Sequence, residues 1–152
     1  MAEYRATVRW ERGEAAFSDG KYSRGHRWDF DGGVTVPASS SPKVVPLPMS
    51  VEAAVDPEEA FVASISSCHM LWFLFYAGKA GLVVDHYQDE AVGTMAKNEQ
   101  GKQAMVKVVL RPAIQFAGAG PAADALADLH HRAHDACFIA NSVTSVISVE
   151  PR

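Results

Sequence analysis

The sequence predicts an α+β fold with a mainly antiparallel sheet, built around one long central helix. Three features indicate this class. Short segments of alternating apolar and polar residues come first, a long apolar run follows at 56–80, and strands and helices then succeed one another without regular alternation. Regular alternation would instead predict a parallel α/β sheet. A chain of 152 residues has the size of one domain, so we expect a single domain over residues 1–152.

The N-terminal part, residues 3–30, is expected to form strands. Residues 3–10 alternate between apolar and polar side chains, which is typical of a half-buried antiparallel strand. Residues 15–18 and 21–30 are predicted to be two further strands, separated by glycine-containing turns. Residues 34–55 are rich in proline and show no period, so we expect a wrapping segment without regular structure.

The central helix is predicted over residues 56–80. Asp56 suits the N-cap, Pro57 suits the first helical position, and Glu59 stands where a capping box needs an acid. Gly81 is a typical C-terminal stop.

The length and apolar composition of this helix also bear on whether the protein forms a dimer. Its run from Ala60 to Ala77 carries no Asp, Glu, Lys or Arg, and it is long enough for a membrane span, but it contains Cys68 and His69 and has no second span beside it. We therefore expect a core helix. At about 36 Å it is too long for one sheet and one short helix to cover, so we expect it to pack on a second copy in a homodimer. The alternative is that the proline-rich segment covers it within one chain.

The C-terminal part is expected to complete the sheet. Residues 90–97 and 102–116 are predicted to form a strand pair around a polar turn, so that strands occupy 90–116. A second helix is predicted over residues 121–135 and a last strand over 143–149.

Charge and cysteine content limit the classes of partner and compartment. The formal net charge is −4, which argues against nucleic acid and anionic membranes as partners. The N-terminus has no apolar signal-peptide core. We therefore expect a cytoplasmic protein, in which lasting structural disulfides are unusual and catalytic ones are not.

The two cysteines, Cys68 and Cys137, are the candidate reactive groups. They stand too far apart for a CxxC motif or a zinc knuckle, so any partnership between them must come from the fold. Free cysteines are usually buried core residues, which is the competing interpretation. Because the helix dipole fades beyond the first turn, a reactive thiol at Cys68 requires a nearby Arg or Lys, positioned by an acid such as Glu58 or Glu59.

Helix geometry constrains that acid. Glu58 and Cys68 lie about 15 Å apart along the helix axis and about 80° apart around it. One guanidinium can hardly reach both within one chain, so we expect the acid of one subunit to act at the thiol of the other.

The histidines give weaker signals. His69 points about 100° away from Cys68, so it is expected to be packed or hydrogen-bonded rather than to act as a base. His130 and His134 have the i,i+4 spacing of metal ligands, but without further ligands a solvated helix face is the expectation. No metal and no cofactor are expected.

Several of these features occur together in one known family. They are the run Asp56-Pro57-Glu58-Glu59, Cys68 ten residues after Glu58, Cys137 at the end of a late helix, and Arg24 ahead of the central helix. In this combination and in element order the chain resembles the OsmC/Ohr family of thiol-dependent (organic hydro)peroxide reductases.

The resemblance implies an intertwined homodimer with two central helices flanked by sheets. Cys68 would be the peroxidatic thiolate, and Cys137 would resolve its sulfenic acid as an intrasubunit disulfide, which an external thiol then reduces. Arg24 would stabilise the thiolate and Glu58 would orient Arg24. Arg27 is the alternative to Arg24.

One departure concerns the branch of the family. Ohr-type members tend to have Pro-Tyr-Ser after the second cysteine, whereas this chain has Phe138-Ile139-Ala140 and looks more like the OsmC branch. Organic hydroperoxides, together with hydrogen peroxide, are the expected substrates. The alternative function is a non-catalytic redox-sensing or ligand-binding dimer on the same scaffold. A thiol-dependent hydrolase or acyl carrier is the third candidate, and no histidine is visibly placed as its base.

Overall fold

The computed structural model describes all residues from Met1 to Arg152. The chain folds as two compact units, Met1–Ala60 and Phe61–Arg152. Two helices and mostly antiparallel strands confirm the predicted α+β class. The expectation that the whole chain acts as a single domain stays a prediction.

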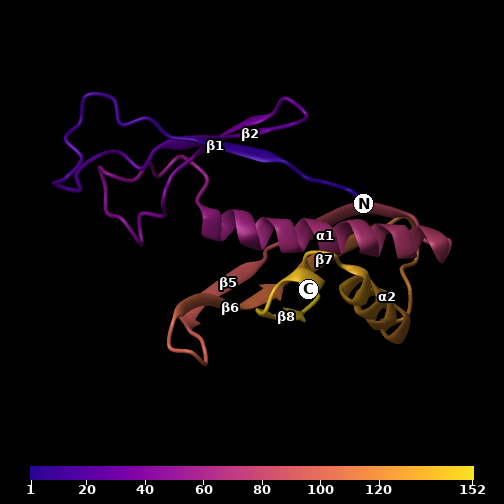
Figure 1. Cartoon of the computed structure of the whole chain (residues 1–152). Helices are drawn as coiled ribbons and strands as arrows, with labels where there is room; N and C mark the ends of the chain where they lie inside the picture. Colours follow the sequence, from indigo (N-terminus) through magenta and orange to yellow (C-terminus); the bar gives the residue numbers. More distant parts are fainter. The chain divides into compact units, whose positions relative to one another are not determined.

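The N-terminal unit contains a three-stranded antiparallel sheet in the order β1-β2-β3. Its strands are β1 (Ala6–Arg9), β2 (His26–Phe30) and β3 (Thr35–Ala38). Figure 1 labels the first two of these strands in the indigo part of the ribbon.

Two expectations for this unit are wrong. Residues 15–18 form no strand, and the strand expected over 21–30 begins only at His26, because the segment before it is bound to a loop rather than to a strand. There the amide of Arg24 donates to the carbonyl of Met49 at 2.7 Å. Conversely, β3 lies inside the segment expected to lack structure. Its Pro37 is tolerated because β3 is an edge strand of this sheet.

Helix α1 spans Pro57–Lys79. The capping box is formed in both directions: Glu59 N–H donates to Asp56 Oδ1 at 2.8 Å, and Asp56 N–H donates to Glu59 Oε1 at 2.9 Å. The helix ends where Gly81 adopts a φ of 75°, a conformation that favours glycine. On length and composition α1 is the one helix that could cross a membrane, yet one of its faces is buried inside the protein.

The C-terminal unit combines α1 with two small sheets and a second helix. Strands β4 and β7 pair antiparallel, and the second sheet has the order β5-β6-β8, with β8 parallel to β6. The elements are β4 (Val84–Asp89), β5 (Val92–Lys97), β6 (Gln103–Leu110), β7 (Pro112–Phe116), α2 (Ala123–Ala136), a 3-10 turn (Ala140–Ser142) and β8 (Val146–Val149).

Strand β4 was not expected, and the strand expected over 102–116 is two strands. The break falls at Arg111, because β6 pairs with β5 and β8 whereas β7 leaves that sheet and pairs with β4. The last strand is shorter than expected, since the 3-10 turn and the loop after it take up the residues before Val146.

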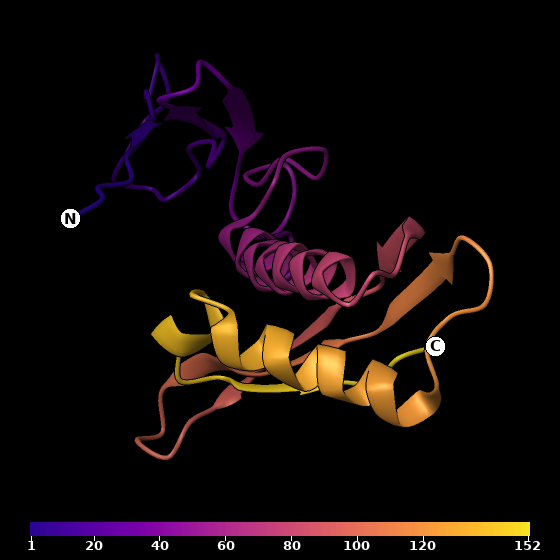
Figure 2. The same cartoon turned by 90° about the vertical axis from the view of Figure 1, so that its right-hand side faces the viewer.

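Helix α1 packs on two apolar clusters in the C-terminal unit. Its C-terminal half places Phe73 and Ala77 against Leu129 and Ala133 of α2. Its N-terminal half places Ile65 in a separate cluster with residues of β6. Figures 1 and 2 show α2 crossing α1 near the C-terminal half of α1. Cys68 therefore stands on α1 where one cluster gives way to the other.

Candidate active site

The C-terminal unit brings the two cysteines together. Both are free thiols; Cys68 is half-buried and Cys137 is only 1% exposed. Cys68 lies close enough to Cys137 to raise the pKa of the Cys137 thiol. This proximity arises because α2 packs on α1: Leu129 and Ala133 share an apolar cluster with Phe73 and Ala77, and Cys137 follows at the C-cap of α2.

The environment of Cys137 keeps its thiol protonated. Burial, and after it the neighbouring Cys68 thiol, raise the pKa of Cys137 to about 11. Its position at the C-terminal end of α2 also disfavours a negative charge. The Ala140 N–H donates to its Sγ at 3.3 Å and acts in the opposite direction, but more weakly. At neutral pH this cysteine is therefore a thiol rather than a thiolate.

An aromatic surface adjoins the two cysteines. Trp72 meets Phe138 edge-on at a centroid distance of 5.4 Å, packs against Phe75 at 5.6 Å and stacks on Tyr76 at 5.8 Å. Phe138 is 67% exposed and Phe75 is 49% exposed, so the surface faces out of the chain. The guanidinium of Arg132 lies over the Tyr76 ring at 4.3 Å. We define the aromatic surface as Trp72, Phe75, Tyr76 and Phe138.

The structure separates the roles of the two candidate acids. Glu59 is engaged in the capping box of α1. Glu58 instead has a buried Oε2 atom without a hydrogen-bond partner. Because an unpaired buried carboxylate oxygen is costly, Glu58 is the acid with capacity for a cation.

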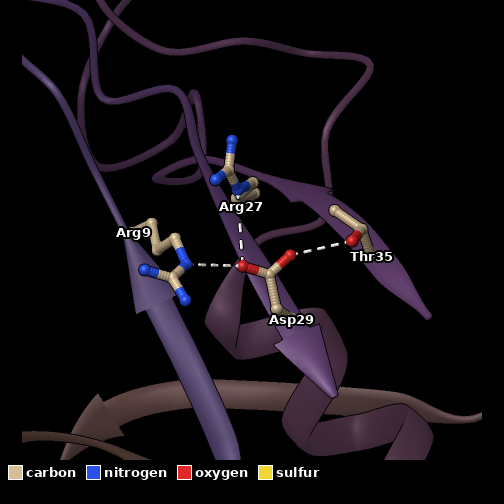
Figure 3. Close-up of polar contacts among 4 residues, drawn as sticks. All are labelled: Arg9, Arg27, Asp29 and Thr35. Carbon is tan, nitrogen blue, oxygen red and sulfur yellow. Dashed lines mark hydrogen bonds and ion pairs between the residues drawn. The ribbon is translucent and has the colours of Figure 1, made fainter. Parts of the chain in front are cut away.

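The two candidate arginines also differ. Arg27 is bound to Asp29 at 3.4 Å, and Asp29 also binds Arg9 at 2.9 Å and Thr35 at 2.8 Å (Figure 3). The hydrogen bonds from Thr35 and Arg9 lower the pKa of Asp29, so this carboxylate stays ionised beside the arginines.

Arg24, by contrast, forms no ion pair within the chain. Its guanidinium donates to the carbonyls of Gly20 at 2.7 Å and Tyr22 at 2.5 Å and lies 3.8 Å from the centre of the Tyr22 ring. Arg24 and Glu58 belong to the N-terminal unit, whereas both cysteines belong to the C-terminal unit.

A buried histidine pair lies next to the cysteines. His69 Nε2 and His130 Nδ1 are 3.1 Å apart, and the two side chains are 1% and 4% exposed. Burial is the main cause that lowers the pKa of each imidazole to about 4. The expectation that His69 is packed and hydrogen-bonded is confirmed.

The expectation of a solvated helix face at His130 is wrong. His130 shares the buried face of α2 with Ala133 and Cys137. Their spacing of three and then four residues is itself the pattern of an inward helix face, so the sequence held a signal for its burial.

Comparisons with known proteins agree on one family. Residues 50–152 match the family model described as OsmC-like protein. An OsmC-like protein of unknown function from Vibrio cholerae is 52% identical, with a TM-score of 0.98 and 100% of both chains covered. No curated protein matches the chain.

Two more distant structures share the fold. An organic hydroperoxide resistance protein from Elizabethkingia anophelis is 18% identical, with a TM-score of 0.71 over 99% of this chain and 94% of the other. The organic hydroperoxide resistance protein OhrB of Bacillus subtilis is 15% identical, with a TM-score of 0.67 over 99% and 98%.

Proposed function

Because this chain belongs to the OsmC-like protein family, we propose that it is a cysteine-based peroxidase that reduces organic hydroperoxides, with hydrogen peroxide as a second candidate oxidant. The observation that carries the proposal is the proximity of Cys68 and Cys137 inside one unit. A peroxidase of this kind needs one accessible thiol and one thiol close enough to trap the oxidised sulfur.

The chemistry begins at Cys68. Its thiolate attacks one oxygen of the hydroperoxide, the O–O bond breaks, and the products are a Cys68 sulfenic acid and an alkoxide that takes up a proton to become the alcohol. Cys68 is suited to this step because it is the less buried of the two cysteines.

Cys137 then resolves the sulfenic acid. Its sulfur attacks the Cys68 sulfur, the S–S bond forms, and the hydroxyl of the sulfenic acid leaves as water with the Cys137 proton. Because the pKa of Cys137 is raised, its thiol must give up its proton during this attack, and the leaving hydroxyl takes up that proton. An external thiol reductant reduces the disulfide and returns both thiols.

Arg24 and Glu58 complete the proposed site. Arg24 stabilises the Cys68 thiolate and Glu58 orients Arg24. Support comes from the free buried oxygen of Glu58 and from the absence of an ion pair at Arg24. Since Glu58 and Cys68 lie about 15 Å apart along α1, we propose a homodimer in which one subunit supplies the acid and the other the thiol.

The exposed apolar residues on α1 support both the dimer and the substrate class. Leu71 is 61% exposed and Phe75 is 49% exposed, although both stand on the central helix. The aromatic surface beside the cysteines favours a carbon-bearing hydroperoxide over hydrogen peroxide, because only the former gains from contact with it.

The test is intact mass and free-thiol titration of the reduced protein after one equivalent of cumene hydroperoxide, with hydrogen peroxide in parallel. The proposal expects both thiols to disappear within one chain, with a loss of about two mass units. Cys68→Ser should abolish the reaction, and Cys137→Ser should permit one turnover followed by over-oxidation. Ser67→Ala, at the exposed neighbour of Cys68, is the matched control and should react normally. Two unreacted thiols in the unaltered protein would refute the proposal.

The second candidate is a non-catalytic redox-sensing or ligand-binding dimer on the same scaffold. It is favoured by the raised pKa of Cys137, because a buried protonated thiol is a slow nucleophile for repeated turnover. Steady hydroperoxide consumption with excess dithiol supports the peroxidase, whereas a single stoichiometric oxidation without further turnover supports the sensor.

A further inference from the structure

The histidine pair occupies a defined place between the two cysteine-bearing helices. On α1, His69 directly follows Cys68 in the sequence and belongs to the buried face of the helix. On α2, His130 stands seven residues before Cys137, which is close to two full helical turns and therefore on the same face. The bond between the two imidazoles is the side-chain hydrogen bond that joins α1 to α2.

The hydrogen bond between the two imidazoles can form only if at least one of the facing nitrogens carries no proton. In the neutral pair, one facing nitrogen donates and the other accepts. If both imidazoles are protonated, both facing nitrogens become donors and the bond is lost. The outward nitrogens, His69 Nδ1 and His130 Nε2, are buried and have no partner, so nothing there stabilises an added proton.

The surroundings offer no carboxylate in contact with the pair. From β4, Asp89 faces His130, but its oxygens are occupied by Ser66 Oγ at 2.5 Å and by the Arg111 N–H at 2.6 Å. From α2, His134 faces His69, and its own protonation opposes a charge there.

The remaining neighbours of the pair bring no charge at neutral pH. Phe73 of α1 stacks on His130 at 4.5 Å. The Tyr87 ring of β4 lies 5.7 Å from the Phe73 ring, and burial raises the pKa of Tyr87, so it stays neutral. Cys137 on α2 is held as a thiol, and the remaining neighbour in sequence is Cys68 itself.

We propose that His69 and His130 are a positioning pair for the dithiol, which holds the buried face of α2 on α1 so that Cys137 meets Cys68, and which releases α2 when acid protonates the imidazoles. The proposal rests on the proposed pairing of the two cysteines. It does not require that peroxide is the oxidant.

The first test measures how often α2 opens. In a Cys68→Ser background, Cys137 is the remaining cysteine and is buried, so its rate of reaction with 4,4′-dithiodipyridine, relative to a free thiol peptide at the same pH, reports opening. Between pH 6.5 and 5.0 this relative rate should rise roughly 15-fold for each imidazole that gains a proton on opening. A rate that does not rise overturns the proposal.

Three variants in that background locate the effect. His130→Leu leaves His69 without its partner, and Cys137 should react about tenfold faster or more at neutral pH. His69→Leu/His130→Leu replaces both partners by apolar groups, so Cys137 should stay protected at neutral pH and lose the acid response. His131→Leu, at the exposed neighbour, is the control and should behave like the parent. An acid response that persists in the double variant refutes the pair as its source.

Two further measurements keep the proposal falsifiable if a variant does not fold. Imidazole titration of the unaltered protein by NMR should show both buried histidines neutral above pH 5, and titration of either one near 6.5 overturns the proposal. With both cysteines present, equilibration against reduced and oxidised dithiothreitol should give a Cys68–Cys137 disulfide at least about tenfold less stable in His130→Leu than in His131→Leu. If that disulfide forms but no peroxide is consumed, the proposed function fails while the positioning pair stands.

Discussion

Acidification should destabilise the C-terminal unit in a specific pH window. His69 and His130 have an ordinary pKa of 6.5 when unfolded and about 4 when folded. Because the folded pKa is depressed, their contribution to stability is complete above pH 6.5 and is lost as pH falls toward 4. At pH 5 the loss is about 2 kcal/mol for each imidazole, or about 4 kcal/mol for the pair.

This loss is large compared with the stability of an ordinary domain, which is about 5–15 kcal/mol. The assay is urea unfolding followed by circular dichroism at pH 7 and pH 5. The unaltered protein and His131→Leu should lose about 4 kcal/mol between these conditions, whereas His69→Leu/His130→Leu should lose much less.

Other groups with shifted pKa values act outside this window. The pKa of Asp29 is lowered from 3.8, so its contribution is lost only at lower pH. The raised pKa values of Cys137 and Tyr87 act in alkali. Equal acid losses in the unaltered protein and in the double variant would therefore contradict the assignment to the histidine pair.

Three other predictions concern single positions. The pKa of Cys137 is raised from 9.0 to about 11, so the free energy of unfolding should fall by about 2–3 kcal/mol as pH rises from below 9 to 11. In urea titrations, Cys137→Ala should remove this part of the alkaline loss. Arg24→Gln should slow thiol loss with cumene hydroperoxide about tenfold or more, whereas Arg27→Gln, which only releases Asp29, should not; equal rates would exclude Arg24. Gly93→Ala should lower the free energy of unfolding by about 1–3 kcal/mol, because the added Cβ would lie 2.6 Å from both Met105 Sδ and Val62 Cγ2. An unchanged midpoint in thermal or urea unfolding would contradict this packing.

The parts of the fold that local sequence determines could be predicted. The capping box at Asp56 and the stop at Gly81 delimit α1 through contacts between near neighbours, so both ends of the observed helix lie within one residue of the expected range. Strand β4 could not be found in the same way. Its sequence, Val-Asp-His-Tyr-Gln-Asp, has few apolar residues, and its strand structure depends on pairing with β7.

The site was predictable in its components but not in its contacts. The sequence identifies Cys68 and Cys137 as candidates, but their proximity depends on how α2 packs on α1, which spacing alone does not encode. The partnership of His69 with His130 depends on the same packing. The i,i+4 spacing predicts that His130 and His134 lie together on a solvated helix face, because the sequence does not say which face of α2 is covered.

Burial defines the pH range in which Cys68 and Cys137 stay packed together. On the alkaline side, Cys137 is neutral below a pKa of about 11, so its burial against Cys68 carries no charge penalty through the neutral range. On the acid side, the histidine pair is neutral above a pKa of about 4 in the folded protein, and its protonation favours opening below pH 6.5. Both limits come from the removal of water around uncharged groups between α1 and α2. Replacing both imidazoles by apolar side chains should therefore lower the pH at which α2 opens. The pH at which Cys137 ionises should stay unchanged, because Cys137 would keep the same burial.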